Sequence, residues 1–510
     1  METVNAIELK GVTKRFGDVI ANDNVNLTVR KGEILSILGE NGSGKTTLMN
    51  MLSGIYFPDE GEIFVNGKAV TIRSPKDSFA LGIGMIHQHF KLINILTAAE
   101  NIILGLPGKE KLNMKKVEKE IKELTDRYGF DLNPSQKIYD MSVSQKQTVE
   151  IVKVLYRGAD ILILDEPTAV LTPQETEKLF AVLRNMRKAG KSIIIITHKL
   201  NEVLELSDRV AVLRKGTYID TVETAQATVE SLTEMMVGEK VKLDINRTEP
   251  DSPEKRIEMR GITCKNKEGM KVLKEASFTA YSGEILGVAG ISGSGQKELL
   301  ESVAGLQPIE SGEIFYFSPE GTTEKISDMK AEDIKKLGIS LSFVPEDRLG
   351  MGLVGSMDLT DNMMIRSYKE GKHFFTDRKT PKKLAEDIVE QLEVVTPGVD
   401  TPVSRLSGGN VQKILVGREI ASNPKVLMVA YPVRGLDINS SYTIYNLLND
   451  QKKKGVAVIC VGEDLDVLLE LCDKILVLNS GRIAGIVDAR TTTKEKLGLM
   501  MTGSAEDKNE

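Results

Sequence analysis

A glycine-rich loop that occurs twice constrains this chain more than any other feature. The first copy reads GENGSGKTT, from Gly39 to Thr47, and the second reads GISGSGQKE, from Gly290 to Glu298. Each copy follows an apolar, strand-like run and precedes a helix-like run, which is the setting in which such a loop binds phosphate. The chain is therefore predicted to be a tandem duplication of an α/β domain, with one loop unchanged and the other altered.

The repeat extends well beyond the glycines. Residues 9–39 and 259–290 share alternating apolar positions, and each half later carries an amphipathic helix, over 115–129 and 382–392. A length of 510 residues fits two domains. We expect the first domain over 1–240, a polar linker over 241–253, the second domain over 254–503 and a disordered tail over 504–510.

Composition excludes several classes of protein. Lys and Arg number 67 against 73 Asp and Glu, so the net charge of −6 argues against nucleic acid as a partner. No apolar stretch approaches the roughly 18–20 residues that span a bilayer, and the N-terminus lacks the pattern of a signal peptide. The three cysteines are too scattered for a disulfide framework or a zinc site, and we expect buried, reduced thiols in a cytoplasmic protein.

The first glycine loop has every group that phosphate binding requires. Backbone N–H groups of the loop and of the following helix would surround the phosphates. Lys45 would neutralise the β and γ oxygens, and the hydroxyl of Thr46 would ligate Mg²⁺. The nucleotide-binding residues expected here are Gly39, Asn41, Gly42, Gly44, Lys45, Thr46 and Thr47.

Two carboxylates end the apolar run ILILDEP at residues 161–167. Asp165 is expected to hold Mg²⁺ and Glu166 to polarise the attacking water as a general base, which typically contributes roughly 10²–10⁴ in rate. His198, at the end of the next strand-like run, is a candidate contact of the γ-phosphate. Gln88, in GMIHQHF, is expected to meet both Mg²⁺ and a partner surface.

Phe16 is an aromatic residue in a loop-like segment, TKRFGD, upstream of the first glycine loop. Stacking of its ring on adenine is one interpretation, and a place in the hydrophobic core is the other.

The sequence LSGGN, from Leu406 to Asn410, resembles the signature of the ATP-binding subunits of ABC transporters, and the resemblance covers nearly the whole chain. It implies two fused ATPase domains of α/β class, each with a RecA-like core, an antiparallel β subdomain and a helical subdomain. It also implies ATP and Mg²⁺ as cofactors. In this family each ATP site takes its glycine loop from one domain and its signature from the other.

Sorting the residues by this rule gives one complete site and one degenerate site. To the residues above, the first site would add Ser407, Gly408, Gly409 and Asp437 from the second half. The second site has the altered residues Gln296, Lys297, Glu346, Ala430, Tyr431 and Glu463, with Asn266 in place of Phe16. Its signature, MSVSQ, has Val143 and Ser144 where glycines are usual, and Thr172 replaces the aspartate. Hydrolysis is not expected there; weak nucleotide binding and a purely scaffolding role both stay open.

Several segments resemble the nucleoside branch of the importers that have fused ATPases, among them residues 82–90 and 156–175. A monosaccharide importer is the alternative. A soluble tandem ATPase acting on ribosomes or nucleic acid fits less well, because such proteins have two complete sites and a long helical linker. The resemblance implies integral-membrane permease subunits as a heterodimer or homodimer, an extracellular or lipoprotein substrate-binding protein as an indirect partner, and no nucleic acid. It places the chain at the cytoplasmic face of the membrane.

Overall fold

The chain forms two compact units, Met1–Lys242 (unit 1) and Leu243–Glu510 (unit 2). The computed structural model describes residues 5–87, 90–106, 113–169, 171–239, 245, 247–266, 269–291, 293–343, 349, 352–368, 376–434 and 436–503. Of the predicted site residues, Gln88 and Glu346 lie outside these ranges, as does the predicted tail over 504–510.

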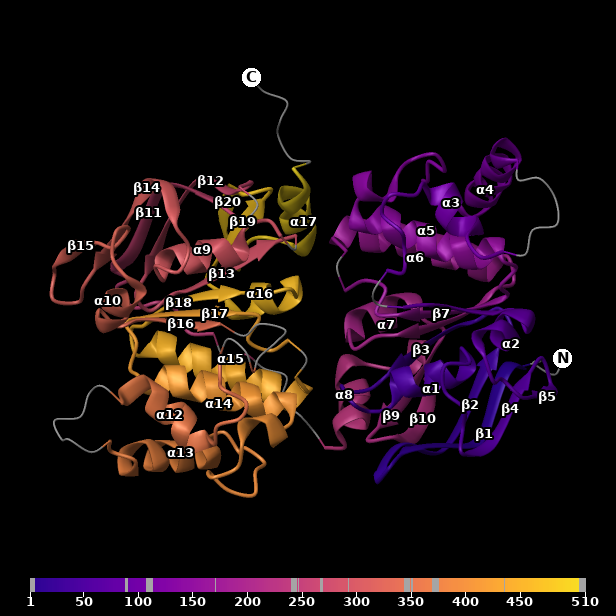
Figure 1. The fold of residues 1–510 in the computed structure, drawn as a ribbon, viewed down its shortest axis with the longest axis horizontal. Coiled ribbons are helices and arrows are strands. Elements are labelled where there is room, and N and C mark those ends of the chain that lie inside the picture. The colour runs from indigo at the N-terminus through magenta and orange to yellow at the C-terminus, as the bar shows by residue number, and fades with distance from the viewer. Residues whose placement is uncertain are drawn as a thin grey trace. The chain divides into compact units, whose positions relative to one another are not determined.

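The described strands of unit 1 form one sheet with two halves of different character (Figure 1). One half is antiparallel, and its two longest strands mix buried and more exposed residues. The other half is largely parallel and has buried, β-branched strands, as a sheet covered by helices requires. The order is β5 (Lys68–Val70), β4 (Glu60–Val65), β1 (Asn5–Phe16), β2 (Val19–Arg30), β10 (Thr217–Glu223), β9 (Arg209–Arg214), β3 (Ile34–Leu38), β8 (Ser192–Ile196), β7 (Ile161–Asp165), β6 (Ile83–Ile86).

Eight described α-helices accompany this sheet. Their bounds are α1 (Lys45–Leu52), α2 (Pro75–Ala80), α3 (Ala98–Ile103), α4 (Met114–Tyr128), α5 (Val143–Tyr156), α6 (Pro173–Lys188), α7 (Leu200–Leu206) and α8 (Val229–Val237). The amphipathic helix predicted over 115–129 is confirmed as α4, whose Val117, Ile121 and Tyr128 are buried.

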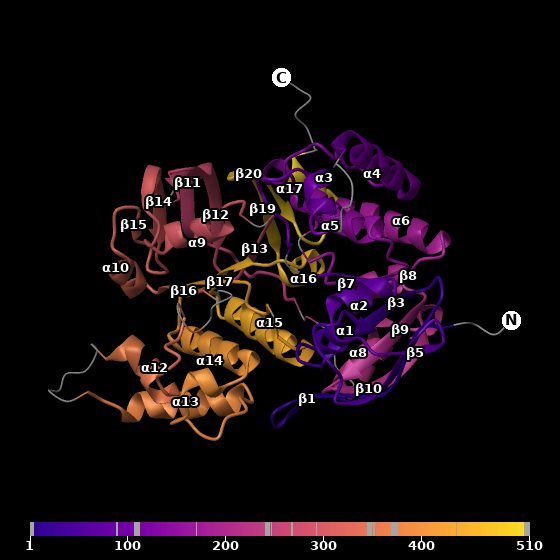
Figure 2. The same cartoon turned by 45° about the vertical axis from the view of Figure 1, so that its right-hand side comes forward.

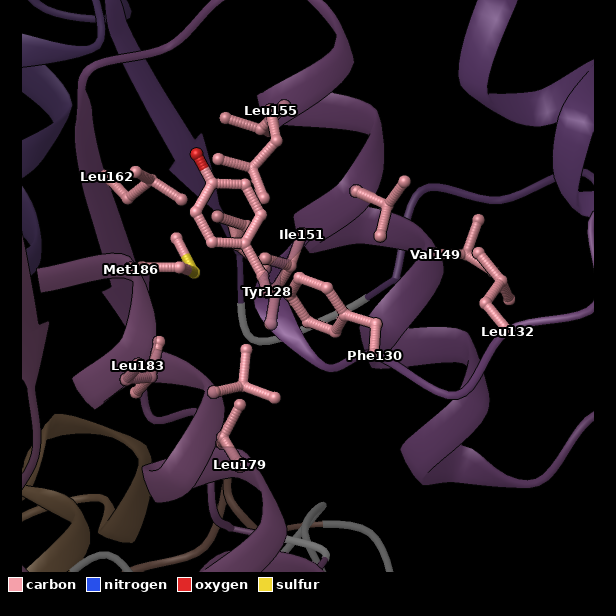
Figure 3. Packing of buried hydrophobic residues seen from close by; sticks show 14 of the residues in the cluster. Tyr128, Phe130, Leu132, Val149, Ile151, Leu155, Leu162, Leu179, Leu183 and Met186 are labelled. Atoms are coloured by element: carbon pink, nitrogen blue, oxygen red, sulfur yellow. The ribbon is translucent and has the colours of Figure 1, made fainter. Parts of the chain in front are cut away.

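The helical part of unit 1 has a core of its own, shown in Figure 3. There the ring of Tyr128 lies among Leu155, Leu162 and Met186, which come from α5, β7 and α6, with Phe130 beside it. These side chains bind the helical part to the strand that ends in Asp165. The carboxylates of the site therefore stand on a rigid support.

Unit 2 repeats this plan with two separate sheets (Figure 2). The antiparallel sheet has the order β12 (Lys271–Tyr281), β11 (Lys255–Lys265), β14 (Ile309–Phe317), β15 (Thr323–Lys325). The largely parallel sheet has the order β16 (Ile339–Phe343), β17 (Val426–Ala430), β18 (Ala457–Val461), β13 (Ile285–Gly290), β19 (Lys474–Asn479), β20 (Arg482–Asp488). Its described helices are α9 (Gln296–Val303), α10 (Ala331–Lys336), α12 (Leu359–Ser367), α13 (Lys379–Gln391), α14 (Gly408–Ala421), α15 (Ile438–Lys453), α16 (Leu465–Leu471) and α17 (Lys494–Thr502). The expected combination of α/β core, antiparallel β part and helical part is confirmed.

The segment that leads into unit 2 packs onto that unit. Ile245 is buried in its core, and Nη1 of Arg247 donates hydrogen bonds to the carbonyl oxygens of Leu469 (3.0 Å) and Cys472. The ammonium of Lys452 donates to the carbonyl of Thr248 at 2.5 Å. This part of the expected linker is therefore anchored to the domain that follows it.

The cysteines are buried and free, as expected: Cys264, Cys460 and Cys472. Within the described ranges, no helix is both long enough and apolar enough to cross a lipid bilayer.

Candidate active site

The glycine loop of unit 1 joins the buried strand β3 to helix α1. Gly44 lies in the left-handed region with φ 93°, and a β-carbon there would lie 2.3 Å from the carbonyl oxygen of Ala21. Only glycine fits this position. Because Gly44 caps α1 without a side chain, the first N–H groups of the helix stay available for an anion.

Lys45 is buried at the start of α1. Its Nζ donates hydrogen bonds to the carbonyl oxygens of Gly39 at 2.6 Å and Glu40 at 2.8 Å. Burial lowers the pKa of Lys45, while the charges of Glu166 and Asp165 act in the opposite direction. The ammonium thus stands in the loop facing the two carboxylates that the sequence singled out.

Asp165 and Glu166 come at the end of β7, and their pKa values are shifted in opposite directions. Burial, followed by the charge of Glu166, raises the pKa of Asp165 to about 6, against the opposing charge of Lys45. Burial also acts to raise the pKa of Glu166, but the hydrogen bond and charge of His198, together with Lys45, outweigh it and lower that pKa. Two adjacent carboxylates, one of them costly to ionise, form a set that a divalent cation would stabilise.

The conformation of the main chain directs the side chain of Glu166 towards His198. Glu166 has φ 46°, and its N–H donates to the carbonyl of Ile196 at 2.9 Å, which joins the end of β7 to the end of β8. Oε1 of Glu166 lies 2.9 Å from Nδ1 of His198. Since an ionised carboxylate only accepts hydrogen bonds, Nδ1 carries the proton and Nε2 points elsewhere. A carboxylate held in this way can accept a proton from a water molecule.

Phe16 is 43% exposed, so the alternative that it belongs to the hydrophobic core is wrong. Its ring meets the ring of Tyr56 edge to face, with centroids 5.1 Å apart, and Nζ of Lys14 lies 5.5 Å from its centroid. An exposed ring held in this way can stack on a flat ligand. Tyr56 and Lys14 were not predicted, because only the fold brings Tyr56 to Phe16.

Lys199, next to His198, is a further charge that sequence reasoning missed. Its Nζ donates to the carbonyl of Thr168 at 3.1 Å and pairs with Glu202 at 3.0 Å. It also contributes to the lowered pKa of Glu166. Lys199 therefore fixes the turn that follows the two carboxylates and favours the ionised form of Glu166.

Unit 2 keeps the main chain of this site and lacks its chemistry. Gly295 has φ 104°, and the buried Gln296 donates from Nε2 to the carbonyl of Ile291 at 3.0 Å, much as Lys45 contacts its own loop. Tyr431 has φ 51°, and its N–H donates to the carbonyl of Val461 at 2.9 Å, as in the turn at Glu166. A buried Ala430 precedes it.

Charged groups at the degenerate site are paired within unit 2. Glu463 lies 3.4 Å from Nε of Arg434, and Lys297 lies 3.7 Å from Glu301. The guanidinium of Arg434 also lies 6.0 Å from the centre of the Tyr431 ring. Asn266, which stands in place of Phe16, accepts the N–H of Met270 at 2.9 Å and closes a turn. An asparagine has no aromatic ring on which adenine could stack.

The signature of unit 2 opens helix α14. Ser407 caps this helix, accepting from the N–H of Asn410 at 3.4 Å and from its Nδ2 at 3.0 Å, and Ser407 and Gly408 are exposed. Asp437 caps α15 by accepting from the N–H of Ser440 at 2.7 Å. In unit 1 the corresponding caps are Ser142 of α5 and Thr172 of α6, each in a capping box.

Comparison with known proteins shows the same duplication of the domain. The family model described as "ABC transporter" matches residues 22–169 and 273–432. The chain is 43% identical to the nucleoside import ATP-binding protein NupA of Lactococcus lactis, over 99% of each chain. It is 41% identical to the guanosine import ATP-binding protein NupO of Bacillus subtilis, over 98% of each.

An ATP-binding protein of sugar import is also similar. The glucose import ATP-binding protein TsgD13 of Haloferax volcanii is 38% identical, with 98% of this chain and 96% of the relative covered. The two matched regions, each beginning ahead of one glycine loop, and the full-length relatives lead to one conclusion. The chain belongs to the ABC transporter family and is an ATP-binding subunit with two fused nucleotide-binding domains.

Proposed function

We propose that this chain hydrolyses ATP to drive nucleoside uptake. The observation that carries the hydrolytic part is the 2.9 Å contact between Glu166 and His198, beside the buried Lys45. The substrate class rests on the two nucleoside import relatives at 43% and 41% identity. The glucose import relative at 38% keeps a monosaccharide as the second candidate.

Within unit 1, each residue has a distinct task in the proposed reaction. Lys45 and the N–H groups at the start of α1 bind the β and γ phosphates, and Phe16 stacks on the adenine. Glu166 accepts a proton from the attacking water, and His198 orients Glu166 through Nδ1 while Nε2 remains for the γ-phosphate.

Mg²⁺ fits the residues at the end of β7. Asp165, whose pKa is raised to about 6 by burial and then by Glu166, loses that penalty when a cation lies beside it. We propose that Thr46, Asp165 and Gln88 hold this ion. When bound, it neutralises phosphate charge.

Unit 2 supplies the remaining groups in this proposal. Ser407, Gly408, Gly409 and Asp437 follow the family pattern for contacts to the ATP of the first domain, and the exposure of Ser407 and Gly408 is compatible with that task. The degenerate site, with Gln296, Ala430 and Tyr431, lacks a lysine and a carboxylate in these positions, so we propose that it does not hydrolyse ATP.

Import ATP-binding proteins of this family work with permease subunits in the membrane. We propose a permease heterodimer or homodimer as the direct partner and an extracellular or lipoprotein substrate-binding protein as an indirect one. This would place the chain at the cytoplasmic face of the membrane.

The direct test is uptake of radiolabelled nucleosides by cells that lack this chain and by the same cells complemented with it. Restored uptake that excess unlabelled nucleoside suppresses and pentose does not is the expected result. Competition by sugars alone would overturn the nucleoside assignment. Complementation with Glu166→Gln is the matched control, and it should leave uptake at the level of the deleted cells.

A further inference from the structure

A buried asparagine fixes one loop of unit 1. Oδ1 of Asn101 accepts the N–H of Ile93 at 2.8 Å, and its Nδ2 donates to the carbonyls of Ile93 at 3.1 Å and Thr97 at 3.0 Å. Asn101 is only 1% exposed. Because one amide satisfies both main-chain groups of Ile93, the loop over 91–97 is held in one shape.

The same arrangement occurs in unit 2. Oδ1 of Asn362 accepts the N–H of Val354 at 2.8 Å, and its Nδ2 donates to the carbonyls of Val354 at 3.1 Å and Asp358 at 2.9 Å. Asn362 is fully buried. The loop over 352–358 is thus the counterpart of the loop over 91–97. In both halves a buried asparagine makes the same hydrogen bonds to such a loop, and we call this arrangement the clamp.

Helix α5 holds the loop of unit 1 from another side. Oε1 of Glu150 accepts the N–H of Lys91 at 2.7 Å, and Nζ of Lys153 donates to the carbonyl of Lys91 at 3.3 Å. Helices α3 and α5 lie side by side (Figures 1 and 2), so Asn101 and Glu150 reach the same loop. α5 is the helix that Ser142 caps, at the signature position of unit 1.

Helix α14 also contacts the loop of unit 2, through an arginine. The buried Arg418 donates from Nη2 to the carbonyl of Gly352 at 2.9 Å and from Nη1 to the carbonyl of Asn362 at 3.3 Å. Positions 408 and 418 are about 15 Å apart along a helix. The clamped loop is therefore joined, through one rigid helix, to the Ser407 cap.

Each loop presents apolar side chains outward while its main chain is engaged internally. Ile95 is 73% exposed, and Ile93 is also exposed. In unit 2, Val354 and Met357 are exposed. A loop of fixed shape with exposed apolar side chains is suited to contact another protein.

The clamp does not depend on hydrolysis in its own domain. Unit 2 has Gln296 and Tyr431 in place of the lysine and the base, yet it keeps Asn362 and Arg418. The task of the clamp is therefore one that both units perform, and contact with a membrane partner is such a task.

We propose that Asn101 and Asn362 are positioning residues for coupling. They hold the loops over 91–97 and 352–358 in the shape that an apolar segment of the permease contacts, and α5 and α14 pass the movement of these loops to the signature positions. This inference rests on the proposed function, because it needs a permease as partner.

The test uses the full chain assembled with its permease in liposomes, comparing wild type with Asn101→Ala and Ile95→Ser. We expect the turnover of permease-stimulated ATP hydrolysis, and uptake with it, to fall about tenfold or more while the KM for ATP stays within about twofold. A tenfold loss corresponds to about 1.4 kcal/mol, close to the net value of one buried hydrogen bond. ATP affinity of the purified chain should not change.

Leu306→Ser is the matched control, because Leu306 is 58% exposed and lies outside both loops; it should behave as wild type. Wild-type turnover in both test variants would overturn the proposal, as would a parallel loss of turnover and ATP affinity. If Asn101→Ala does not accumulate, Asn362→Ala takes its place, because Asn362 makes the same hydrogen bonds in unit 2. Permease-stimulated hydrolysis does not depend on the solute carried, so it separates this proposal from the nucleoside assignment.

Discussion

Replacing Asp165 with asparagine should stabilise the ligand-free protein while it removes function. Burial raises the pKa of Asp165 to about 6, with a further contribution from Glu166, so ionising this carboxyl costs more in the folded state than in the unfolded state. Asparagine has nearly the same shape and no charge. Asp165→Asn should therefore remove a cost that the wild type bears in the absence of Mg²⁺.

The expected increase in the free energy of unfolding follows from the difference between the pKa of Asp165 in the folded and in the unfolded state. A rise from the usual value near 3.8 to about 6 is about two pKa units, or about 3 kcal/mol at about 1.4 kcal/mol per unit. Partial solvent access reduces this figure, and we expect about 1–3 kcal/mol. Because the folded pKa is the higher one, the gain is complete above about pH 6 and shrinks as the pH falls towards 4, where the aspartate is protonated in both states.

The assay is urea unfolding of the full chain without nucleotide or Mg²⁺, at several values between pH 5 and pH 8. The transition of unit 1 is followed separately from that of unit 2, since two domains need not unfold together. Asp160→Asn is the control, because Asp160 lies just before the same strand with its side chain 76% exposed. Equal stability of Asp165→Asn and wild type at pH 8, or a gain that does not change with pH, would refute the reasoning.

Four further substitutions test the site, the last of them as a control. Glu166→Gln should lower ATP turnover of the assembled transporter by roughly 10²–10⁴ and preserve ATP binding, and substantial residual hydrolysis would exclude Glu166 as the base. Gln296→Ala should leave turnover within about twofold, whereas a fall to background would show that the degenerate site takes part in the chemistry. Gly44→Ala should weaken ATP binding at least about tenfold, because its β-carbon would meet the carbonyl of Ala21 at 2.3 Å. Gly42→Ala, where no atom lies within 4 Å, should weaken binding less in the same titration, and equal losses would contradict the steric argument.

Local sequence patterns were enough to predict the supports of the site. The apolar run before Gly39 is strand β3, the run after Gly44 is helix α1, and the apolar face of residues 115–129 is buried in α4. These elements depend on neighbours a few residues away, so periodicity and turn residues are sufficient to place them.

Contacts between distant residues could not be predicted in this way. Glu166 meets His198 across two adjacent strands, and Tyr56 comes to Phe16 only through the fold. Glu463, one of the altered residues of the second site, forms an ion pair with Arg434 at 3.4 Å. An ion pair of this kind depends on side-chain directions that sequence spacing does not define.

Glu166 and Tyr431 share a left-handed turn of the main chain but differ in the chemistry of their side chains. A residue other than glycine costs about 1 kcal/mol or more in that conformation, and tyrosine bears this cost without the chemistry of a carboxylate. The path of the main chain is therefore set by the strands around it and not by the side chain at the turn. A substitution at this position can therefore remove or restore the carboxylate without changing the fold of the domain. Unit 2 is thus a suitable template for designing a second working site.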